Sequence, residues 1–393
     1  MHRCHPSREL HAQSGFSLVE ILVGIVIGAV ALLAIVQTVI VFERHTQTTS
    51  SGGDAQVAGT LAMFNLERDI KQAGLGFGRA NLATLGCNVQ AEAPGTLGVF
   101  NFQLTPLRID VGAGGAPDTI EVLYGNSSFF VTEEQFIGPP AAQTKRLVRR
   151  NGFHPGDLAV VAGNASASAA SATCHLIEVT ADSDPDGFTI GHAPGAYASF
   201  YAAASATARY NPAAGTGTTY TGGTLYNLGP APQLNRWTAA SGVLQRFDRI
   251  GISAVPLEIA DGVVSLKAQY GVDTSTPSDG TVDEWTSDPP SVWVLHTGEW
   301  NRIFAVRLAV LVRSRQFERN GDPSASATAP MTATVPVWSG SASAPFVMTD
   351  VSGAADTFSS APTTAKPDNW RFYRYRVYER VVPLRNMLWG QRE

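Results

Sequence analysis

The feature that most constrains this chain of 393 residues is an apolar run near its N-terminus. Residues Ile21–Phe42 carry no charge, and their only polar members are Gln37 and Thr38. About 20 apolar residues suffice to span a bilayer as a helix, so the run predicts a transmembrane helix. Glu20 directly precedes it. Because a carboxylate at the edge of hydrocarbon is costly without a partner, Glu20 is a candidate functional residue.

The order of the parts differs from that of a secretory signal, in which the cleavage site follows a shorter apolar core. Here Gly15 and Phe16 precede the run, so a cut between them leaves the helix on the mature protein. Residues Gly15–Glu20 and the following apolar helix resemble the N-terminus of type IV pilins and type II secretion pseudopilins. The resemblance implies that a prepilin peptidase cuts after Gly15 and methylates the new amine of Phe16.

The same resemblance implies a role for Glu20, because the corresponding carboxylate in that family pairs with the N-terminal amine of a neighbouring subunit. Such a pair offsets part of the desolvation cost and sets the axial register. The amine exists only after cleavage, so assembly is expected to depend on processing. Gly24 and Gly28 form a small-xxx-small face that permits close helix approach; alternatively, they are simply tolerated in a membrane helix.

The sequence divides the chain into three expected parts. Residues 1–15 are the leader peptide, residues 16–73 a long helix, and residues 74–393 a β-rich head. The helix is expected to have a transmembrane and assembly half, 16–45, and an amphipathic half, 54–73. The predicted fold class is therefore α+β, with a long N-terminal helix packed on a large pilin-like head. The basic leader favours a cytoplasmic N-terminus, which gives a single-pass inner-membrane protein with a periplasmic head.

Helical spacing in the amphipathic half predicts one buried face, formed by Met63, Leu66, Ile70 and Ala73 and widened by Val57, Leu61 and Phe64. The Ser50–Gly53 sequence contains two consecutive glycines, which predict a kink or break between the two halves. Gly74 is the expected C-cap of the helix.

Beyond the helix, short runs of alternating hydrophobicity predict strands at 119–124, 158–162, 175–180, 263–270, 302–313 and 373–384. Tracts rich in alanine, serine and threonine separate some of these runs, at 162–173, 198–223 and 322–345. Because the tracts are low in charge and poor in large side chains, they are expected to be surface insertions or flexible loops.

Three cysteines occur in the chain, and Cys4 would leave with the leader. Cys87 and Cys174 remain, an even number in a part expected to face an oxidising periplasm. The prediction is a disulfide between them, and the alternative is two buried free thiols. Closing a loop of this length contributes about 4 to 5 kcal/mol in the chain-entropy description.

Further phrases in the head resemble PilW-type minor pilins: Leu66–Gly74, Leu225–Gly229, Gly262–Asp273, Ala305–Ser314 and Val382–Asn386. The resemblance implies a minor pilin that primes or caps a type IV pilus, with a place at the tip. Its implied partners are the prepilin peptidase, other minor and major pilins, and the inner-membrane assembly platform. Two alternatives stay open: a minor pseudopilin of type II secretion similar to GspJ, and a tip-exposed adhesin or receptor.

One acidic segment is a candidate metal-binding loop. Asp273, Asp279 and Asp283 surround Gly280 in a pattern that resembles the start of a calcium loop. The spacing departs from the EF-hand, because Thr286 stands where the bidentate glutamate is expected. An acidic turn without metal is the alternative reading. Calcium is thus a candidate ligand, and no cofactor is required.

Other functional classes find little support in the sequence. It lacks the common zinc-protease, serine-hydrolase, phosphate-loop and dinucleotide motifs, so no enzymatic activity is predicted. A net charge of −5 argues against nucleic acid as a partner. The run Trp370–Arg380 interleaves arginines with aromatics, which suits a stacking platform or, equally, a strand. His154, His175 and His192 are interpreted as structural residues.

Overall fold

The structure is a computed structural model, and it describes residues 17–78, 84–93, 98–128, 133–137, 141–149, 152–164, 173–182, 187–216, 220–251, 255–293, 296, 298–315, 331–351 and 368–388. The chain forms two compact units, of which the first ends at Gly53 and the second begins at Asp54. The predicted cleavage residues Gly15 and Phe16 lie outside the described residues.

The long helix predicted from the sequence is α1, Leu18–Ile70. The prediction of a break at Ser50–Gly53 is wrong, because these residues lie inside the helix. A glycine within a helix costs only about 1 kcal/mol relative to alanine, which neighbouring turns can offset. The helix ends at Ile70, three residues before the predicted end, and a turn continues to Gly74. Gly74 adopts a φ of +79° and its N–H donates to the Leu123 carbonyl at 2.9 Å, so the chain turns away from the helix there.

The largest sheet, sheet A, has nine strands in the order β2-β1-β8-β7-β13-β5-β6-β10-β9. In chain order its strands are β1 (Asn88–Ala93), β2 (Gly98–Gln103), β5 (Glu133–Ile137), β6 (Thr144–Leu147), β7 (Leu158–Gly163), β8 (Thr173–Glu178), β9 (Ala181–Asp182), β10 (Thr189–Gly191) and β13 (Gly222–Gly229). Strands β1 and β8 are parallel, and the other pairs in this sheet are antiparallel. A small hairpin joins β11 (Ala196–Ala198) to β12 (Ser205–Thr207).

Two further antiparallel sheets complete the described part of the head. Sheet B has the order β16-β15-β14-β4-β3, with β3 (Leu107–Asp110), β4 (Thr119–Tyr124), β14 (Gln233–Ala240), β15 (Val243–Asp248) and β16 (Leu257–Asp261). Sheet D has the order β18-β17-β19-β20, with β17 (Val263–Val272), β18 (Glu284–Thr286), β19 (Ile303–Arg313) and β20 (Tyr375–Pro383). The short helical turns are η1 (Ala113–Gly115), η2 (Pro290–Val292), η3 (Trp300–Arg302), η4 (Asn369–Phe372) and α2 (Arg385–Leu388).

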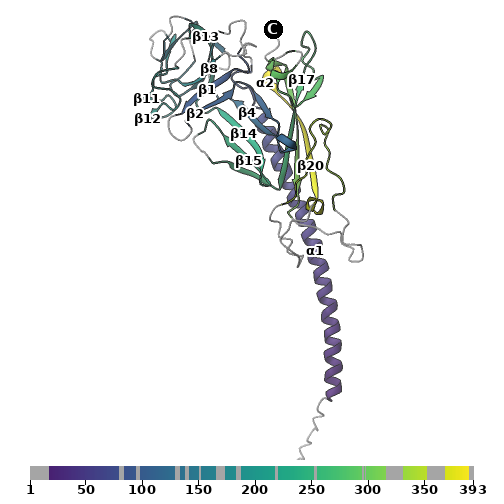
Figure 1. Cartoon of the computed structure of the whole chain (residues 1–393). Coiled ribbons are helices and arrows are strands. Elements are labelled where there is room, and N and C mark those ends of the chain that lie inside the picture. Colours follow the sequence, from purple (N-terminus) through teal and green to yellow (C-terminus); the bar gives the residue numbers. More distant parts are fainter. Residues whose placement is uncertain are drawn as a thin grey trace, which may run out of the picture. The chain divides into compact units, whose positions relative to one another are not determined.

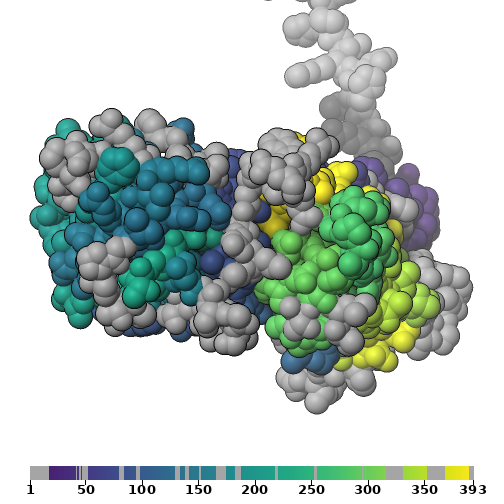
Figure 2. All heavy atoms as spheres, turned by 90° about the horizontal axis from the view of Figure 1, so that it is seen from above, coloured from purple at the N-terminus to yellow at the C-terminus, as the bar shows by residue number. Residues whose placement is uncertain are grey.

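This arrangement confirms the α+β fold class, and every strand listed from the sequence overlaps an observed one. Within the second unit, α1 runs beside β14 and β15 on one flank and β20 on the other (Figure 1). From above, most of the sheet A strands gather in one lobe and the strands of sheet D in another (Figure 2). One face of sheet A has a separate core, which includes Phe136, Val161, Ile177 and Leu225.

The main core joins the second half of α1 to sheets B and D and to one face of sheet A. Ala62, Leu66 and Ile70 are completely buried in it. The predicted widening of this face is wrong, because Val57, Leu61 and Phe64 are 69%, 44% and 61% exposed. These three residues lie on the opposite side of the helix, where the head does not cover them.

The alanine-, serine- and threonine-rich tracts pack more closely than expected. Tyr210 and Tyr220, in the tract 198–223, are buried. Trp338 and Ala344, in the tract 322–345, cover the second face of sheet D together with Phe346. These aromatic anchors dock parts of the predicted surface insertions on the head. Residues 165–172 of the first tract lie outside the described residues.

A disulfide links Cys87, which directly precedes β1, to Cys174 on β8. Both side chains are buried, and 87 residues separate them in the sequence. The disulfide thus closes a long loop across the parallel strand pair of sheet A.

Candidate assembly interface

The N-terminal part of α1 is the most exposed apolar element that the structure describes. The segment Leu18–Ile40 is long and apolar enough to cross a membrane, and its residues are exposed along the whole segment. A helix that is apolar on all sides is stable only when lipid or protein surrounds it. The segment therefore needs a membrane or neighbouring helices.

Glu20 lies in the first turn of this segment and is exposed. Its backbone N–H donates to the Ser17 hydroxyl at 3.2 Å, so Ser17 caps the helix. A carboxylate in the first turn is favoured by the helix dipole. The side chain is thus accessible to a partner, and its pairing with a Phe16 amine stays a prediction.

The predicted helix-packing glycines face open space. A Cβ atom built on Gly24 or Gly28 would meet nothing within 4 Å. Their small size is therefore not required by contacts within the chain, and another helix can approach this face closely. Whether one does so is a prediction.

A buried carboxylate that the sequence analysis missed attaches the second half of α1 to sheet B. Asp69 is 4% exposed. It accepts hydrogen bonds from the Tyr124 hydroxyl at 2.7 Å, from Asn235 Nδ2 at 2.9 Å and from Trp237 Nε1 at 2.6 Å. Tyr124 lies on β4, and the other two donors lie on β14. Burial raises the pKa of Asp69, and these hydrogen bonds lower it.

One signal in the sequence could have identified Asp69. Together with Ala62, Leu66 and Ala73 it falls at spacings of 4, 3 and 4, which places it on the buried face of the helix. An acid at such a position requires hydrogen-bond donors from the head. Its three donors come from two strands, so Asp69 fixes the rotation of the helix on sheet B.

Replacing Asp69 by alanine should destabilise the head by about 3 kcal/mol, because three buried donors would lose their acceptor. Urea unfolding followed by tryptophan fluorescence measures the change in the free energy of unfolding. Lys71→Ala is the matched control, since the exposed Lys71–Glu67 pair should contribute under about 1 kcal/mol. Equal effects of the two variants would contradict an anchoring role for Asp69.

On the other flank of α1, β20 holds the helix through side chains from the arginine- and aromatic-rich run. The ring of Tyr378 covers Gly59, where an added Cβ would lie 2.0 Å from a ring carbon. Arg376 donates to Gln56 at 3.3 Å, and Arg380 pairs with Glu67 at 3.4 Å. These contacts support the strand interpretation of the run. Nearby, Asn386 donates to the carbonyls of Gln72 and Ala73.

The first part of α1 is apolar and exposed, and the second part of the same helix packs against strands of the head. Residues 226–386 match the family model described as Type IV Pilus-assembly protein W, and residues 10–36 match the Prokaryotic N-terminal methylation motif. These two matches support a PilW-type prepilin-like protein. No curated protein and no solved structure matches the chain. The PilW match contains sheet D and the strands β14–β16, whereas β1–β12 precede it.

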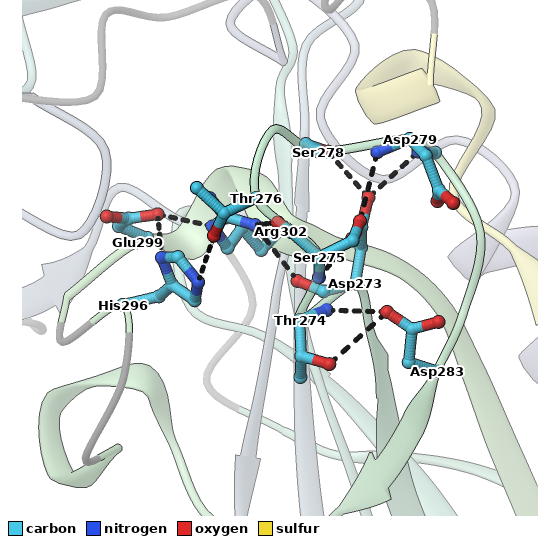
Figure 3. A network of polar contacts seen from close by, with 11 residues as sticks. Asp273, Thr274, Ser275, Thr276, Ser278, Asp279, Asp283, His296, Glu299 and Arg302 are labelled. Atoms are coloured by element: carbon cyan, nitrogen blue, oxygen red, sulfur yellow. Dashed lines mark hydrogen bonds and ion pairs between the residues drawn. The ribbon is translucent and has the colours of Figure 1, made fainter.

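The predicted calcium residues take part in a hydrogen-bonded loop (Figure 3). Asp273 accepts from the N–H and hydroxyl of Ser275, from the Ser278 hydroxyl at 2.6 Å and from the Gly280 N–H at 2.8 Å. Asp283 accepts from the N–H and hydroxyl of Thr274. Asp279 accepts from the Thr281 N–H at 2.8 Å. The acids therefore shape the turn themselves.

A second group of side chains lies beside this loop in Figure 3. Arg302 donates to the carbonyls of Asp273 and Ser275, and it pairs with Glu299, which also contacts His296. The guanidinium thus holds the start of the loop against η3.

Calcium binding stays a prediction. Among the described residues, no group of three histidine, cysteine, aspartate or glutamate side chains is placed to hold a metal ion. Binding at Asp273, Asp279 and Asp283 would require the loop to exchange its hydrogen bonds for metal contacts. A rise in the melting temperature of the head at millimolar calcium, lost in Asp279→Asn, would support the site. An unchanged melting temperature would dismiss it.

The Asp273 hydrogen bonds predict a pH dependence of stability. Burial alone would raise the pKa of this carboxyl, but the donors of Ser275, Ser278 and Gly280 lower the pKa to about 2. A depressed pKa stabilises the fold above the ordinary aspartate value, and the stabilisation is lost as the pH falls toward 2. The shift corresponds to about 2 kcal/mol.

The test compares Asp273→Asn with the unchanged chain in urea at pH 6 and at pH 2. The difference in the free energy of unfolding should shrink by about 2 kcal/mol in acid. The exposed neighbour variant Asp279→Asn is the matched control. A difference that stays constant down to pH 2 would rule out this role for Asp273.

The three histidines interpreted as structural lie in the lobe of sheet A and the turns beside it. His192 is completely buried and contacts Lys145 Nζ at 3.1 Å. His175 hydrogen-bonds to Tyr220, and His154 stacks on Phe200 with ring centroids 4.1 Å apart. These contacts hold His154 and His175 by packing, whereas the buried Nδ1 of His192 has no hydrogen-bond partner among the described residues.

Proposed function

We propose that this PilW-type prepilin is a minor pilin that primes or caps a type IV pilus at the inner membrane. The observation that carries the proposal is the exposed apolar segment Leu18–Ile40, which has Glu20 at its start and belongs to a chain that matches both families. Such a segment can be buried by lipid before assembly and by other pilin helices afterwards.

Cleavage of the leader would control when the helix moves from the lipid into the filament. Cleavage after Gly15 creates the amine of Phe16, to which a neighbouring carboxylate such as Glu20 can pair. The prepilin peptidase and the assembly platform are the expected machinery, and the head lies in the periplasm. The protein acts through helix–helix and head–head contacts and not through catalysis. The size of the second unit, from Asp54 to Glu393, favours a low-copy subunit at or near the tip.

The test is an in-frame deletion in a strain whose pilus retraction is also disabled. Surface pili are counted by electron microscopy. Few or no pili, restored by the full-length chain, would support priming. Normal pili would contradict a role in priming and would favour a secretion pseudopilus or a dispensable tip function.

The lobe of sheet A favours a second candidate function, that of a tip-exposed adhesin or receptor. Most of this lobe precedes the PilW match, and one face of its sheet packs on a core separate from the main one. At its surface Phe200 and Tyr201 are 55% and 40% exposed, and the Tyr201 hydroxyl donates to Asp157 at 2.6 Å. Fixed exposed aromatics are common contact residues. Loss of surface attachment by piliated Phe200→Ala cells would support this function.

A further inference from the structure

One edge of sheet A is built from three short strands. The strands β6, β10 and β9 end the sheet, and they are four, three and two residues long. In the described strands, β6 pairs with β5 at Phe136–Leu147 and at Ile137–Arg146. Elements with few cross-strand contacts open at a low cost in free energy, so this edge is a candidate for local opening.

The core behind this edge contains basic side chains among its apolar ones. Lys145 alternates with Leu147 on β6, and His192 follows Ile190 of β10 at the same spacing of two. Leu147 and Ile190 belong to the separate core on one face of sheet A, so Lys145 and His192 face that core too. Lys145 is 4% exposed, and His192 is completely buried.

The Lys145 ammonium fixes the protonation state of His192. It donates to the carbonyls of Ala141 at 2.9 Å and Thr144 at 3.2 Å, and it lies 3.1 Å from His192 Nε2. An ammonium has three donors and no acceptor, so Nε2 accepts and the imidazole is neutral. The ring proton is then on the buried Nδ1, which has no hydrogen-bond partner among the described residues.

A second proton on this imidazole is strongly disfavoured in the folded chain. It would occupy Nε2, take away an acceptor of Lys145 and bring two buried cations within 3.1 Å of each other. Burial and the Lys145 charge lower the pKa of His192 to about 3. The same two causes lower the pKa of His175, which hydrogen-bonds to Tyr220 on this face of the sheet.

The carboxylates around this core do not compensate the basic groups. Glu178 on β8 pairs with Arg209. Glu134 on β5 is buried, which raises its pKa, and the charge that acts on it is that of Arg149. A raised carboxyl pKa makes acid favour the folded chain, so Glu134 opposes opening in acid. In the described part of the chain, no carboxylate contributes to the charge environment of the lysine–histidine pair.

We propose that the Lys145–His192 pair is an acid-sensitive switch, which holds β6, β10 and β9 on sheet A near neutral pH and releases them below about pH 6. Once released, His192 is exposed and takes up a proton at its ordinary pKa near 6.5. The open edge therefore binds more protons than the closed edge between about pH 6.5 and 3, so acid favours opening. Release would leave β5 as the edge of sheet A and uncover Leu147 and Ile190.

The test is hydrogen–deuterium exchange of the full chain in detergent micelles, read by mass spectrometry at about pH 7 and about pH 4.5. The opening constant of peptides from β6 and β10, corrected for the intrinsic exchange rate, should rise about 80-fold in acid from His192 alone. Peptides from β19, in sheet D, are the internal reference and should change far less.

Three variants separate the switch from a general loss of stability. His192→Gln keeps an acceptor for Lys145 but takes up no proton, so it should reduce the acid effect at least about tenfold. Lys145→Met removes the like charge and should also weaken the effect. His154→Gln is the matched control and should keep the full effect, because His154 is partly exposed and stacks on Phe200.

The readout is the ratio of the opening constants at the two pH values, which a variant that merely destabilises the edge leaves unchanged. Three results would overturn the switch: no acceleration of β6 and β10 in acid, an acceleration that His192→Gln leaves unchanged, or an equal acceleration in β19.

Discussion

Glu20→Ala should leave the chain cleaved and held in the inner membrane but absent from filaments. The exposed carboxylate lies at the start of an apolar helix, where an unpaired charge is costly once water is removed. Pairing with the amine created at Phe16 offsets that cost only in one axial register. Without Glu20 the helix still partitions into lipid but loses this register. Immunoblots of sheared filaments and of membranes measure the two populations.

Glu43→Ala is the matched control, because Glu43 is an exposed carboxylate of α1 beyond the apolar run. It should enter filaments at the level of the unchanged chain. Normal incorporation of Glu20→Ala would defeat the register role. A loss of cleavage in Glu20→Ala would instead place the carboxylate in recognition by the peptidase.

Removing the disulfide should have the largest effect on the stability of the head. The Cys87–Cys174 bond closes a loop with a sequence separation of 87 residues. In the chain-entropy description, opening such a loop costs about 4 to 5 kcal/mol. The double variant Cys87→Ala, Cys174→Ala should therefore unfold at a much lower urea concentration.

Reductant separates the effect of the bond from that of the side chains. Dithiothreitol should destabilise the unchanged chain and leave the double variant unaffected. Titration of the unreduced, denatured mature protein should find no free thiol. Two free thiols per chain would show that the bond does not form in the cell.

Local sequence signals predicted the elements that depend on short-range patterns. The apolar run predicted the start of α1, and Gly74, with its positive φ, lies in the turn that follows the helix end at Ile70. In β19, the alternation from Phe304 to Val312 predicted a strand with one face in the main core. The pairing of Cys87 with Cys174 followed from counting cysteines in an oxidising compartment.

Features that depend on contacts between distant parts of the chain could not be predicted from local sequence patterns. Hydrophobic spacing could not distinguish the packed face of α1 from the exposed side that carries Val57, Leu61 and Phe64, because both sides are apolar. Asp69 was missed because its donors lie on β4 and β14, more than 50 residues away. Trp338 docks on sheet D from a tract whose composition resembles that of a loop.

The N-terminal peptide of this chain, recovered from purified filaments and analysed by mass spectrometry, would decide between assembly and simple anchoring. A pilin built into the filament after processing should yield a peptide that begins at a methylated Phe16. Filaments that contain the chain with its leader still attached, or that lack the chain while processed protein accumulates in the membrane, would contradict processing-dependent incorporation.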